Sequence, residues 1–171
     1  YFRHARTGDF IVTEPLVLGH EVAGEIVAVG AGTAGLAPGD RVAVNPSRWC
    51  GACTRCREGR PNLCENIYFM GSASKTPHMQ GGFATLFDAT PAQCVKVPDT
   101  LSFAAASLAE PLAVTLHAVA RAGAVGGASA AVFGAGPIGL LTMLAARRAG
   151  VGEITALDIA PAPLAFASDL G

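Results

Sequence analysis

The sequence predicts a β-rich domain followed by an α/β domain, and three observations support this prediction. The first part of the chain contains short valine-rich stretches separated by Gly and Pro. From Ser102 onward the apolar spacing becomes helical, and a strand, a glycine-rich turn and a helix follow one another at 130–149. Four of the five cysteines are clustered in the first part. We expect a β-rich domain at 1–109, with a cysteine lobe at 45–66, and the beginning of an α/β domain at 110–171.

Strands in the first domain are predicted from β-branched residues that lie between turn signals. We expect a strand between Pro15 and Gly19 that leads into a tight turn, and further strands at 22–29 and 41–44. The intervening residues 30–40 are rich in Gly and indicate a loop. Returning strands are predicted at 81–87 and 93–97. Short strands with this punctuation are typical of a small β-barrel or sandwich.

The second part of the chain alternates helix and strand. Ser102 is a plausible N-cap of a first helix, and Pro111 is expected to open a second helix that runs to about Ala122. A buried strand, a helix and a second strand then follow at 130–133, 138–149 and 153–157. This alternation predicts an α/β domain.

Composition excludes several classes of function. The net charge is −1 and only 15% of the residues are charged, which argues against a nucleic-acid partner because such a partner calls for a basic surface. No apolar run reaches the ~18 residues of a membrane span, so no membrane partner is expected. Clustered cysteines without a disulfide pattern favour the reducing cytoplasm. Because the first residue is Tyr1 and not Met, we interpret the chain as a fragment.

The cysteine lobe has the pattern of a structural zinc site. The spacing C-x2-C-x2-C-x7-C suits one tetrahedral zinc ion, and its members are Cys50, Cys53, Cys56 and Cys64. A disulfide pair is disfavoured because the rest of the chain does not look secreted. An iron–sulfur cluster is the other alternative, although such runs usually place a fourth cysteine three residues on, followed by Pro. The lobe is polar, so we expect a metal to hold it together. The fifth cysteine, Cys94, is interpreted as a small buried apolar residue.

The glycine-rich turn has the spacing of a dinucleotide-binding fingerprint. Gly134-x-Gly136-x-x-Gly139 follows a predicted strand and opens a helix, and Asp158 ends the next strand. In this pattern Gly134 permits the tight turn, Gly136 lets the backbone approach a pyrophosphate, and Gly139 lets helix and strand pack closely. The alternative is a turn that binds no ligand.

The residues around these glycines indicate which dinucleotide would bind. Pro137 fits the first helical turn, and the N–H of Ile138 can point at a phosphate at the helix N-terminus. Asp158 would bind the ribose hydroxyls and repel a 2′-phosphate, and it is followed by Ile159 and not by Arg. NAD is therefore favoured over NADP.

A second group of candidate metal ligands consists of one histidine and two carboxylates. One His with two carboxylates could form a metal site with an open position, and the residues are His20, Glu21 and Glu110. His20 could equally be a hydrogen-bonded structural histidine, and Glu110 a carboxylate that interacts with a helix dipole. Spacing alone does not decide between these interpretations.

Taken together, these motifs resemble the zinc-containing medium-chain dehydrogenase family, and the resemblance covers essentially the whole chain. It is carried by the Gly-His-Glu motif at 19–21, the cysteine lobe, Glu110-Pro111-Leu112 and the glycine fingerprint. The stretches 45–47, 62–64, 69–74 and 77–83 are most similar to the branch that oxidises L-idonate, and sorbitol and xylitol dehydrogenases share much of the pattern. The resemblance implies a GroES-like β-barrel catalytic domain, truncated at its N-terminus, followed by part of a Rossmann-type domain.

The resemblance also assigns roles to the candidate residues. The cysteine zinc is structural, and a second, catalytic zinc is held by His20 together with Glu21, directly or with Glu110 through water. A further cysteine ligand and a proton-relay serine are expected upstream of Tyr1. Tyr1 and Phe69 match positions that line the substrate pocket of the polyol branch.

The implied activity is transfer of a hydride from a secondary alcohol of a polyol or sugar acid to NAD. For L-idonate, the C5 hydroxyl would become the ketone of 5-ketogluconate. The resemblance also implies a homodimer or homotetramer at full length. Sorbitol, xylitol or L-threonine is the alternative substrate within the family, a family member without catalytic zinc is another interpretation, and a binding module built on the cysteine lobe is the non-enzymatic one.

Overall fold

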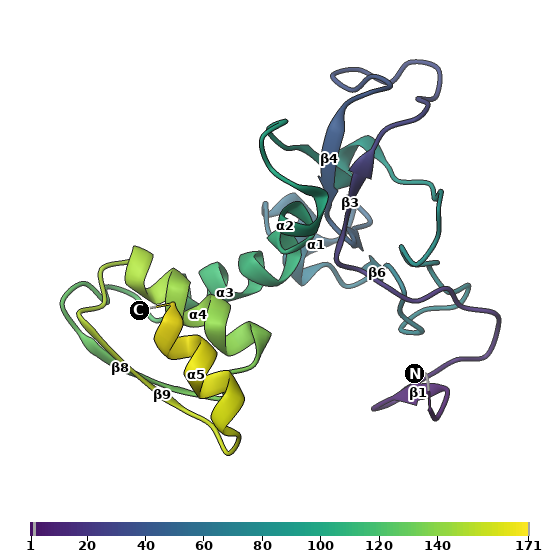
Figure 1. The fold of residues 1–171 in the computed structure, drawn as a ribbon. Helices are drawn as coiled ribbons and strands as arrows, with labels where there is room; N and C mark the ends of the chain where they lie inside the picture. The colour runs from purple at the N-terminus through teal and green to yellow at the C-terminus, as the bar shows by residue number, and fades with distance from the viewer. Residues whose placement is uncertain (2, 171) are drawn as a thin grey trace. The chain divides into compact units, whose positions relative to one another are not determined.

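The computed structural model describes Tyr1 and residues 3–170, and the chain divides into two compact units (Figure 1). The first unit is Tyr1–Glu110 and the second is Pro111–Gly171. Each unit is described by itself. None of the helices in the described part of the chain is long and apolar enough to cross a membrane.

A three-stranded antiparallel sheet forms the centre of the first unit. Its strands are β3 (Val22–Glu25), β4 (Arg41–Val44) and β7 (Cys94–Lys96), in the order β3-β4-β7. Val42 and Val44 of the central strand are buried with Met70, which leaves only 1% of its surface exposed. The prediction of strands at 41–44 and around residue 95 is confirmed. The strand predicted at 22–29 is shorter in the structure, where β3 ends at Glu25.

Two short antiparallel strand pairs and several single-turn helices also belong to this unit. The strands β1 (Arg6–Thr7) and β2 (Phe10–Ile11) form one hairpin. The strands β5 (Ser47–Arg48) and β6 (Tyr68–Phe69) pair across the cysteine lobe, where the two helical turns are α1 (Thr54–Arg57) and η1 (Pro61–Leu63). The 3-10 turn η2 (Pro91–Gln93) precedes β7 and is closed by a capping box between Thr90 and Gln93.

The predicted strands at 16–18 and 81–87 are wrong. Neither segment forms a regular strand in the structure, and residues 82 and 84–86 of the second are bends. The two segments run beside each other, with N–H groups of residues 81–83 donating to the carbonyls of Val17, Gly19 and Leu18. Pro15 removes one donor from the first segment, and Gly81 lies so close to Leu18 and Gly19 that a Cβ on it would lie 2.4 Å from the Gly19 carbonyl oxygen. Side chains therefore complete the pairing.

The first unit ends with α2 (Phe103–Ser107), which begins at the predicted N-cap. The Ser102 hydroxyl accepts a hydrogen bond of 3.1 Å from the N–H of Ala105. The next helix, α3 (Ala109–Arg121), starts two residues before the predicted first position at Pro111. Pro111 is tolerated there because the first-turn N–H groups have no partner within a helix.

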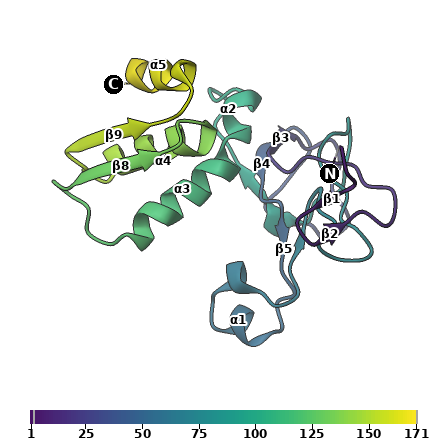
Figure 2. The same cartoon turned by 90° about the horizontal axis from the view of Figure 1, so that it is seen from below.

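In the second unit, two parallel strands are joined by a helix. The strands β8 (Ser129–Phe133) and β9 (Glu153–Leu157) pair in parallel, and α4 (Pro137–Arg148) connects them. Figure 2 shows the two strands side by side with α5 (Pro161–Asp169) following β9. Residues of α4, β9 and α5 line one cavity of about 460 Å³, so both helices cover the same face of this sheet. The predicted elements at 130–133, 138–149 and 153–157 are confirmed within one residue.

Candidate metal centres and the glycine-rich turn

The four cysteines of the lobe converge on one point. The sulfur atoms of Cys50, Cys53, Cys56 and Cys64 all lie within 4.8 Å of one another, and the cysteines are free thiols. Zinc binds thiolate sulfur at about 2.3 Å, which places the sulfurs of a tetrahedral site about 3.8 Å apart. The four sulfurs therefore fit one tetrahedral metal ion with no open position.

Backbone N–H groups surround the sulfur atoms of the lobe. Cys64 Sγ accepts from the N–H groups of Cys50 and Asn66, both at 3.3 Å, and Cys50 Sγ accepts from the N–H of Cys53 at 3.4 Å. The N–H groups of Cys56 and Glu65 lower the pKa of the Cys53 thiol to about 6. Desolvation raises the pKa of the Cys56 thiol to about 12, and a metal bound by the four sulfurs would displace the thiol protons.

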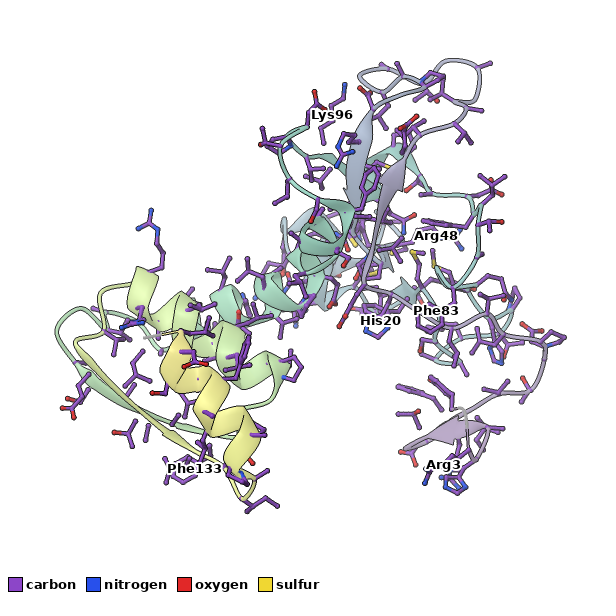
Figure 3. The ribbon with its side chains drawn as sticks, in the orientation of Figure 1. Arg3, His20, Arg48, Phe83, Lys96 and Phe133 are labelled. Carbon is purple, nitrogen blue, oxygen red and sulfur yellow. The ribbon has the colours of Figure 1, made fainter. Side chains whose placement is uncertain are left out.

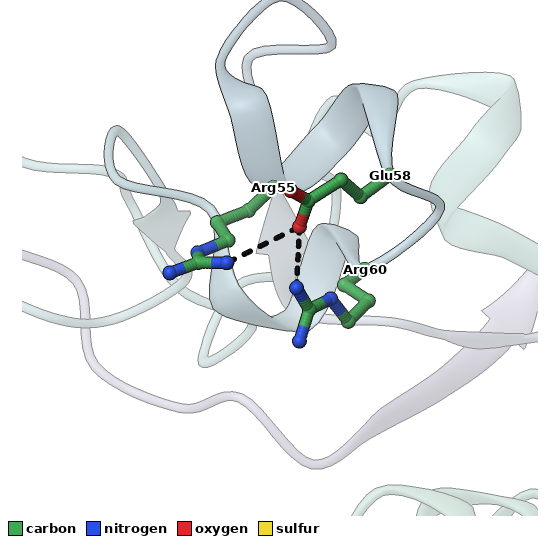
Figure 4. Close-up of polar contacts among 3 residues, drawn as sticks. All are labelled: Arg55, Glu58 and Arg60. Atoms are coloured by element: carbon green, nitrogen blue, oxygen red, sulfur yellow. Dashed lines mark hydrogen bonds and ion pairs between the residues drawn. The ribbon is translucent and has the colours of Figure 1, made fainter.

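The rest of the lobe offers little apolar support. Neither of its helical turns, α1 and η1, contains a buried residue. On its surface, the Glu58 carboxylate forms ion pairs with Arg55, at 3.2 Å between nitrogen and oxygen, and with Arg60 (Figure 4). Exposed pairs of this kind contribute little to stability. The order of the lobe must therefore come mainly from the cysteine site.

A second convergence lies elsewhere in the first unit. Donor atoms of His20, Glu21 and Glu110 all lie within 4.8 Å of one another, although Glu110 is distant in sequence. One imidazole and two carboxylates are ligands that zinc accepts, and three protein ligands leave a position free for a substrate oxygen. Burial raises the pKa of the Glu110 carboxyl above its usual range, while the nearby His20 opposes this shift and Glu21 adds to it.

Aromatic rings and a glycine turn place His20 (Figure 3). Gly19 has a φ of +100°, and a Cβ at this position would lie 2.7 Å from the Phe83 ring. The ring of Phe69 lies 5.2 Å from the His20 ring between centroids. Phe69, which the family resemblance assigns to the pocket, thus lies beside the candidate metal ligand His20, at a distance typical of aromatic contacts.

Tyr1 is held against a loop of the same unit. Its hydroxyl accepts from the N–H of Ala73 at 3.1 Å and lies 3.4 Å from the Ser72 hydroxyl. Residues 69–73 therefore connect the two side chains that the resemblance assigns to the substrate pocket.

The glycine-rich turn lies between β8 and α4. Gly134 has a φ of +97°, and a Cβ on Gly139 would lie 1.8 Å from the Gly134 carbonyl oxygen. A Cβ on Gly136, in contrast, would meet no atom within 4 Å. The first and third glycines are required by the fold itself, whereas the second leaves open space. The N–H of Ile138 belongs to the first turn of α4, which begins at Pro137.

Asp158 is tied to this turn. Its carboxylate accepts hydrogen bonds from the N–H of Ala160 at 2.9 Å and from the N–H of Ala135 at 2.7 Å, and these bonds lower its pKa. Ile159 beside it is fully exposed. The link from Asp158 to the glycine turn is a contact that sequence reasoning did not anticipate.

Sequence reasoning also missed His78 and Gln80 as structurally important residues. His78 is 7% exposed and uses both ring nitrogens, and Gln80 forms two hydrogen bonds to the segment that precedes His20. In the sequence, the signal for this role was the presence of two polar residues within the stretch 77–83, which resembles one branch of the family.

Comparison with known proteins defines the family. The sequence profile of the alcohol dehydrogenase GroES-like domain matches residues 2–99. This match covers more than half of the chain, which therefore belongs to the GroES-like domain family of the zinc-type medium-chain dehydrogenases.

The relatives carry several substrate names. Sorbitol dehydrogenase of Bacillus subtilis is 40% identical over 171 residues, which is 100% of this chain and 47% of that protein. L-idonate 5-dehydrogenase of Vitis vinifera is 41% identical over all of this chain and 46% of its own length. The crystal structure of L-idonate 5-dehydrogenase from Escherichia coli aligns with a TM-score of 0.92 at 37% identity, covering 98% of this chain and 48% of that one. The chain thus spans about half the length of the relatives it matches.

Proposed function

We propose that this chain is the part of a zinc-dependent dehydrogenase that binds two zinc ions and supplies the first residues of the NAD-binding site. The observation that carries the proposal is the convergence of His20, Glu21 and Glu110 beside a separate, closed cysteine site. A closed four-thiolate site stabilises a lobe, whereas a site with three protein ligands leaves a position open for substrate. The family membership of residues 2–99 supports the same assignment.

The three residues of the second site would divide the work between them. His20 would supply a neutral imidazole, and the Phe69 ring beside it would restrict its orientation. Glu21 would supply the carboxylate ligand, and Glu110 would assist directly or through water. A zinc ion held there would supply the Lewis acidity that lowers the pKa of a bound alcohol, and NAD would supply the hydride acceptor.

The glycine-rich turn would hold the dinucleotide. Open space at Gly136 leaves the backbone accessible to a pyrophosphate, and the N-terminus of α4, including the N–H of Ile138, would favour its charge. Asp158 would accept the ribose hydroxyls, which favours NAD over NADP. A solved relative from Sinorhizobium meliloti, 36% identical over 93% of this chain with a TM-score of 0.86, is bound to NADP, so this preference needs its own test.

For the substrate, we propose a secondary alcohol of a polyol or sugar acid, with C5 of L-idonate as the first choice. Relatives named for sorbitol, D-xylulose and L-idonate all match at about the same identity, which supports the class. The choice of L-idonate rests on the similarity of the stretches 45–47, 62–64, 69–74 and 77–83 to that branch and on the alignment with the Escherichia coli structure.

The test uses the full-length protein that contains this chain. Zinc is counted by atomic emission, and NAD reduction is followed with L-idonate, sorbitol, xylitol and L-threonine at equal concentrations. We expect two zinc ions per chain and the highest kcat/KM with L-idonate. One zinc ion per chain would contradict the catalytic site, and a clear preference for sorbitol would contradict only the choice of substrate.

A further inference from the structure

The segment that leads into His20 is held by a distant part of the chain. Residues 13–19 form no regular strand, yet backbone groups of Thr13, Pro15, Val17, Leu18 and Gly19 are paired with residues 78–83. Backbone bonds join Gly81 to Val17 at 2.7 Å and Phe83 to Leu18 at 2.9 Å. Side chains of the second segment make the remaining bonds, at its start.

His78 makes a contact that fixes its own protonation pattern. Its Nε2 lies 3.0 Å from the backbone nitrogen of Thr13, which can only donate, so Nε2 accepts. Its Nδ1 lies 2.7 Å from the carbonyl oxygen of Lys75, which can only accept, so Nδ1 carries the proton. The N–H of His78 also donates to the Glu14 carboxylate. One buried residue thus joins the loop around Lys75 to the beginning of the 13–19 segment.

Gln80 continues the same attachment two residues later. Its amide oxygen accepts from the N–H of Val17 at 2.7 Å, and its amide nitrogen donates to the carbonyl of Pro15 at 3.0 Å. The side-chain amide therefore pairs as a peptide group of a neighbouring strand would. The Pro15 carbonyl and the Val17 N–H are thereby paired although no backbone group of the second segment bonds to either of them.

Close backbone contacts around Gly19 connect this attached segment to the candidate metal ligands His20 and Glu21. A Cβ on Gly81 would lie 2.4 Å from the Gly19 carbonyl oxygen, and one on Gly71 would lie 2.7 Å from the Gly19 nitrogen. Gly19 is thus enclosed by two other backbone segments immediately before His20. Because the Gly19 backbone has no room to shift, the attachment of the 13–19 segment determines where His20 and Glu21 begin.

From this arrangement we infer that His78 and Gln80 are positioning residues for the metal site of His20, Glu21 and Glu110. They touch no member of that site; they act by fixing the 13–19 segment, from which two of its three ligands follow directly. This inference rests on the proposed metal site but not on the substrate. Groups that hydrogen-bond metal ligands directly typically change metal affinity 10- to 100-fold when removed. The segment that His78 and Gln80 hold leads directly into two of the three ligands, so we expect an effect of similar size.

Two substitutions of His78 separate the contact between segments from the local one. In His78→Gln, the amide oxygen replaces Nε2 and can still accept from Thr13. In His78→Asn, the shorter amide replaces Nδ1 and can still donate to Lys75, but it cannot reach Thr13. Both variants remove the ring and keep a polar amide, so they form a matched pair.

The experiment measures zinc release from the full-length, zinc-loaded protein to a colorimetric chelator, together with thermal melting. We expect two phases, with His78→Asn accelerating the release of one zinc ion about 10- to 100-fold. The zinc ion of the cysteine lobe should leave at the wild-type rate, and His78→Gln should stay close to wild type. Gln80→Leu, at an exposed position, should accelerate the same phase as His78→Asn.

The outcomes are distinguishable. Wild-type release of both ions from His78→Asn and Gln80→Leu would overturn the inference while leaving the proposed function intact. Equal acceleration of both phases, or equal effects of His78→Asn and His78→Gln, would show a general structural role and overturn it as well. A wild-type protein that holds only the cysteine zinc would overturn the proposed function and this inference with it. If His78→Asn does not fold, Gln80→Leu gives the answer.

Discussion

At the scale of single residues, the turn between β3 and β4 depends on one carboxylate. Asp40 Oδ2 lies 2.8 Å from Lys96 Nζ and accepts from the N–H of Ala37 at 2.7 Å. The Lys96 side chain, followed by the Ala37 N–H, lowers the pKa of Asp40 below its ordinary value. A carboxyl with a lowered pKa stabilises the fold above its unfolded-state pKa, and this contribution is lost as the pH falls through the folded-state value.

We therefore expect Asp40→Asn to destabilise the protein at pH 7, with a difference from wild type that shrinks toward zero in acid. Urea denaturation at several pH values between about 2 and 7 measures this difference. Lys96→Met is the matched control, because it removes the ion pair but leaves the bond to Ala37. A constant difference across the pH range would contradict the electrostatic explanation.

The residue beside Asp158 offers a test of cofactor choice. Ile159 is fully exposed, so Ile159→Arg removes no buried apolar contact and adds a cation where a 2′-phosphate would lie. A charge-assisted bond of about 1.5–3 kcal/mol corresponds to roughly a tenfold or greater rise in the NADP-to-NAD ratio of kcat/KM. Steady-state kinetics of the full-length protein measure the ratio, and Ile159→Gln controls for side-chain length. An unchanged ratio would mean that the ribose lies elsewhere.

Residue identity predicted some ligands far better than others. The cysteines lie close in sequence, so their spacing alone indicated one metal site. Glu110 comes from a different segment than His20, and only the tertiary structure brings their donor atoms within 4.8 Å. For the same reason the contact between His78 and Thr13 left no local signal, because it depends on how two distant loops approach.

At the scale of secondary-structure elements, propensity and capping rules predicted the elements whose formation depends on their own residues. The Ser102 cap, the strand β4 and the whole of β9 followed from capping and β-branched content. The strand predictions at 16–18 and 81–87 were wrong, because hydrogen bonds of a glutamine side chain and close contacts of glycines take the place of regular strand pairing. The helix α5 was not predicted, because its apolar residues are spread around the helix and form no stripe.

The turn that opens α4 separates folding from binding. Gly139→Ala would place a Cβ 1.8 Å from the Gly134 carbonyl oxygen, a backbone atom that cannot move aside. Gly136→Ala meets no atom within 4 Å, so it should fold normally yet obstruct a pyrophosphate. We expect a loss of about 1–3 kcal/mol in stability for Gly139→Ala.

Thermal melting and a fluorescence titration with NADH check both expectations in the full-length protein. For Gly136→Ala we expect a wild-type Tm and NADH binding weakened at least about tenfold, which corresponds to 1.4 kcal/mol. Wild-type NADH affinity in Gly136→Ala would remove the dinucleotide from this turn. A wild-type Tm in Gly139→Ala would show that the turn can open to accept a methyl group.

At the scale of the whole molecule, the two metal sites should contribute differently to stability. The cysteine lobe lies within the first unit, contains no buried residue in its helical turns, and is closed by β5 and β6 at its base. Structural zinc contributes about 10–16 kcal/mol in small peptides that cannot fold without it. His20 and Glu21 of the second site instead directly precede β3, whose Val22 packs against the apolar core of Val42, Val44 and Met70.

Removal of zinc from the lobe should therefore unfold the lobe before the rest of the protein. Arg55 and Arg57 are trypsin sites inside it, but Arg60 is not, because it precedes Pro61 and its bond resists trypsin. The Arg55 and Arg57 side chains are accessible, so only backbone order protects these bonds. We expect rapid tryptic cleavage after Arg55 and Arg57 once a strong chelator removes both ions, and none on the same timescale in the zinc-loaded protein. Cys53→Ser should reproduce this cleavage without chelator, because three thiolates no longer close the site. His20→Ala, which affects only the second site, should leave the lobe resistant. Equal resistance of the zinc-free and zinc-loaded proteins would show that hydrogen bonds to sulfur hold the lobe without a metal.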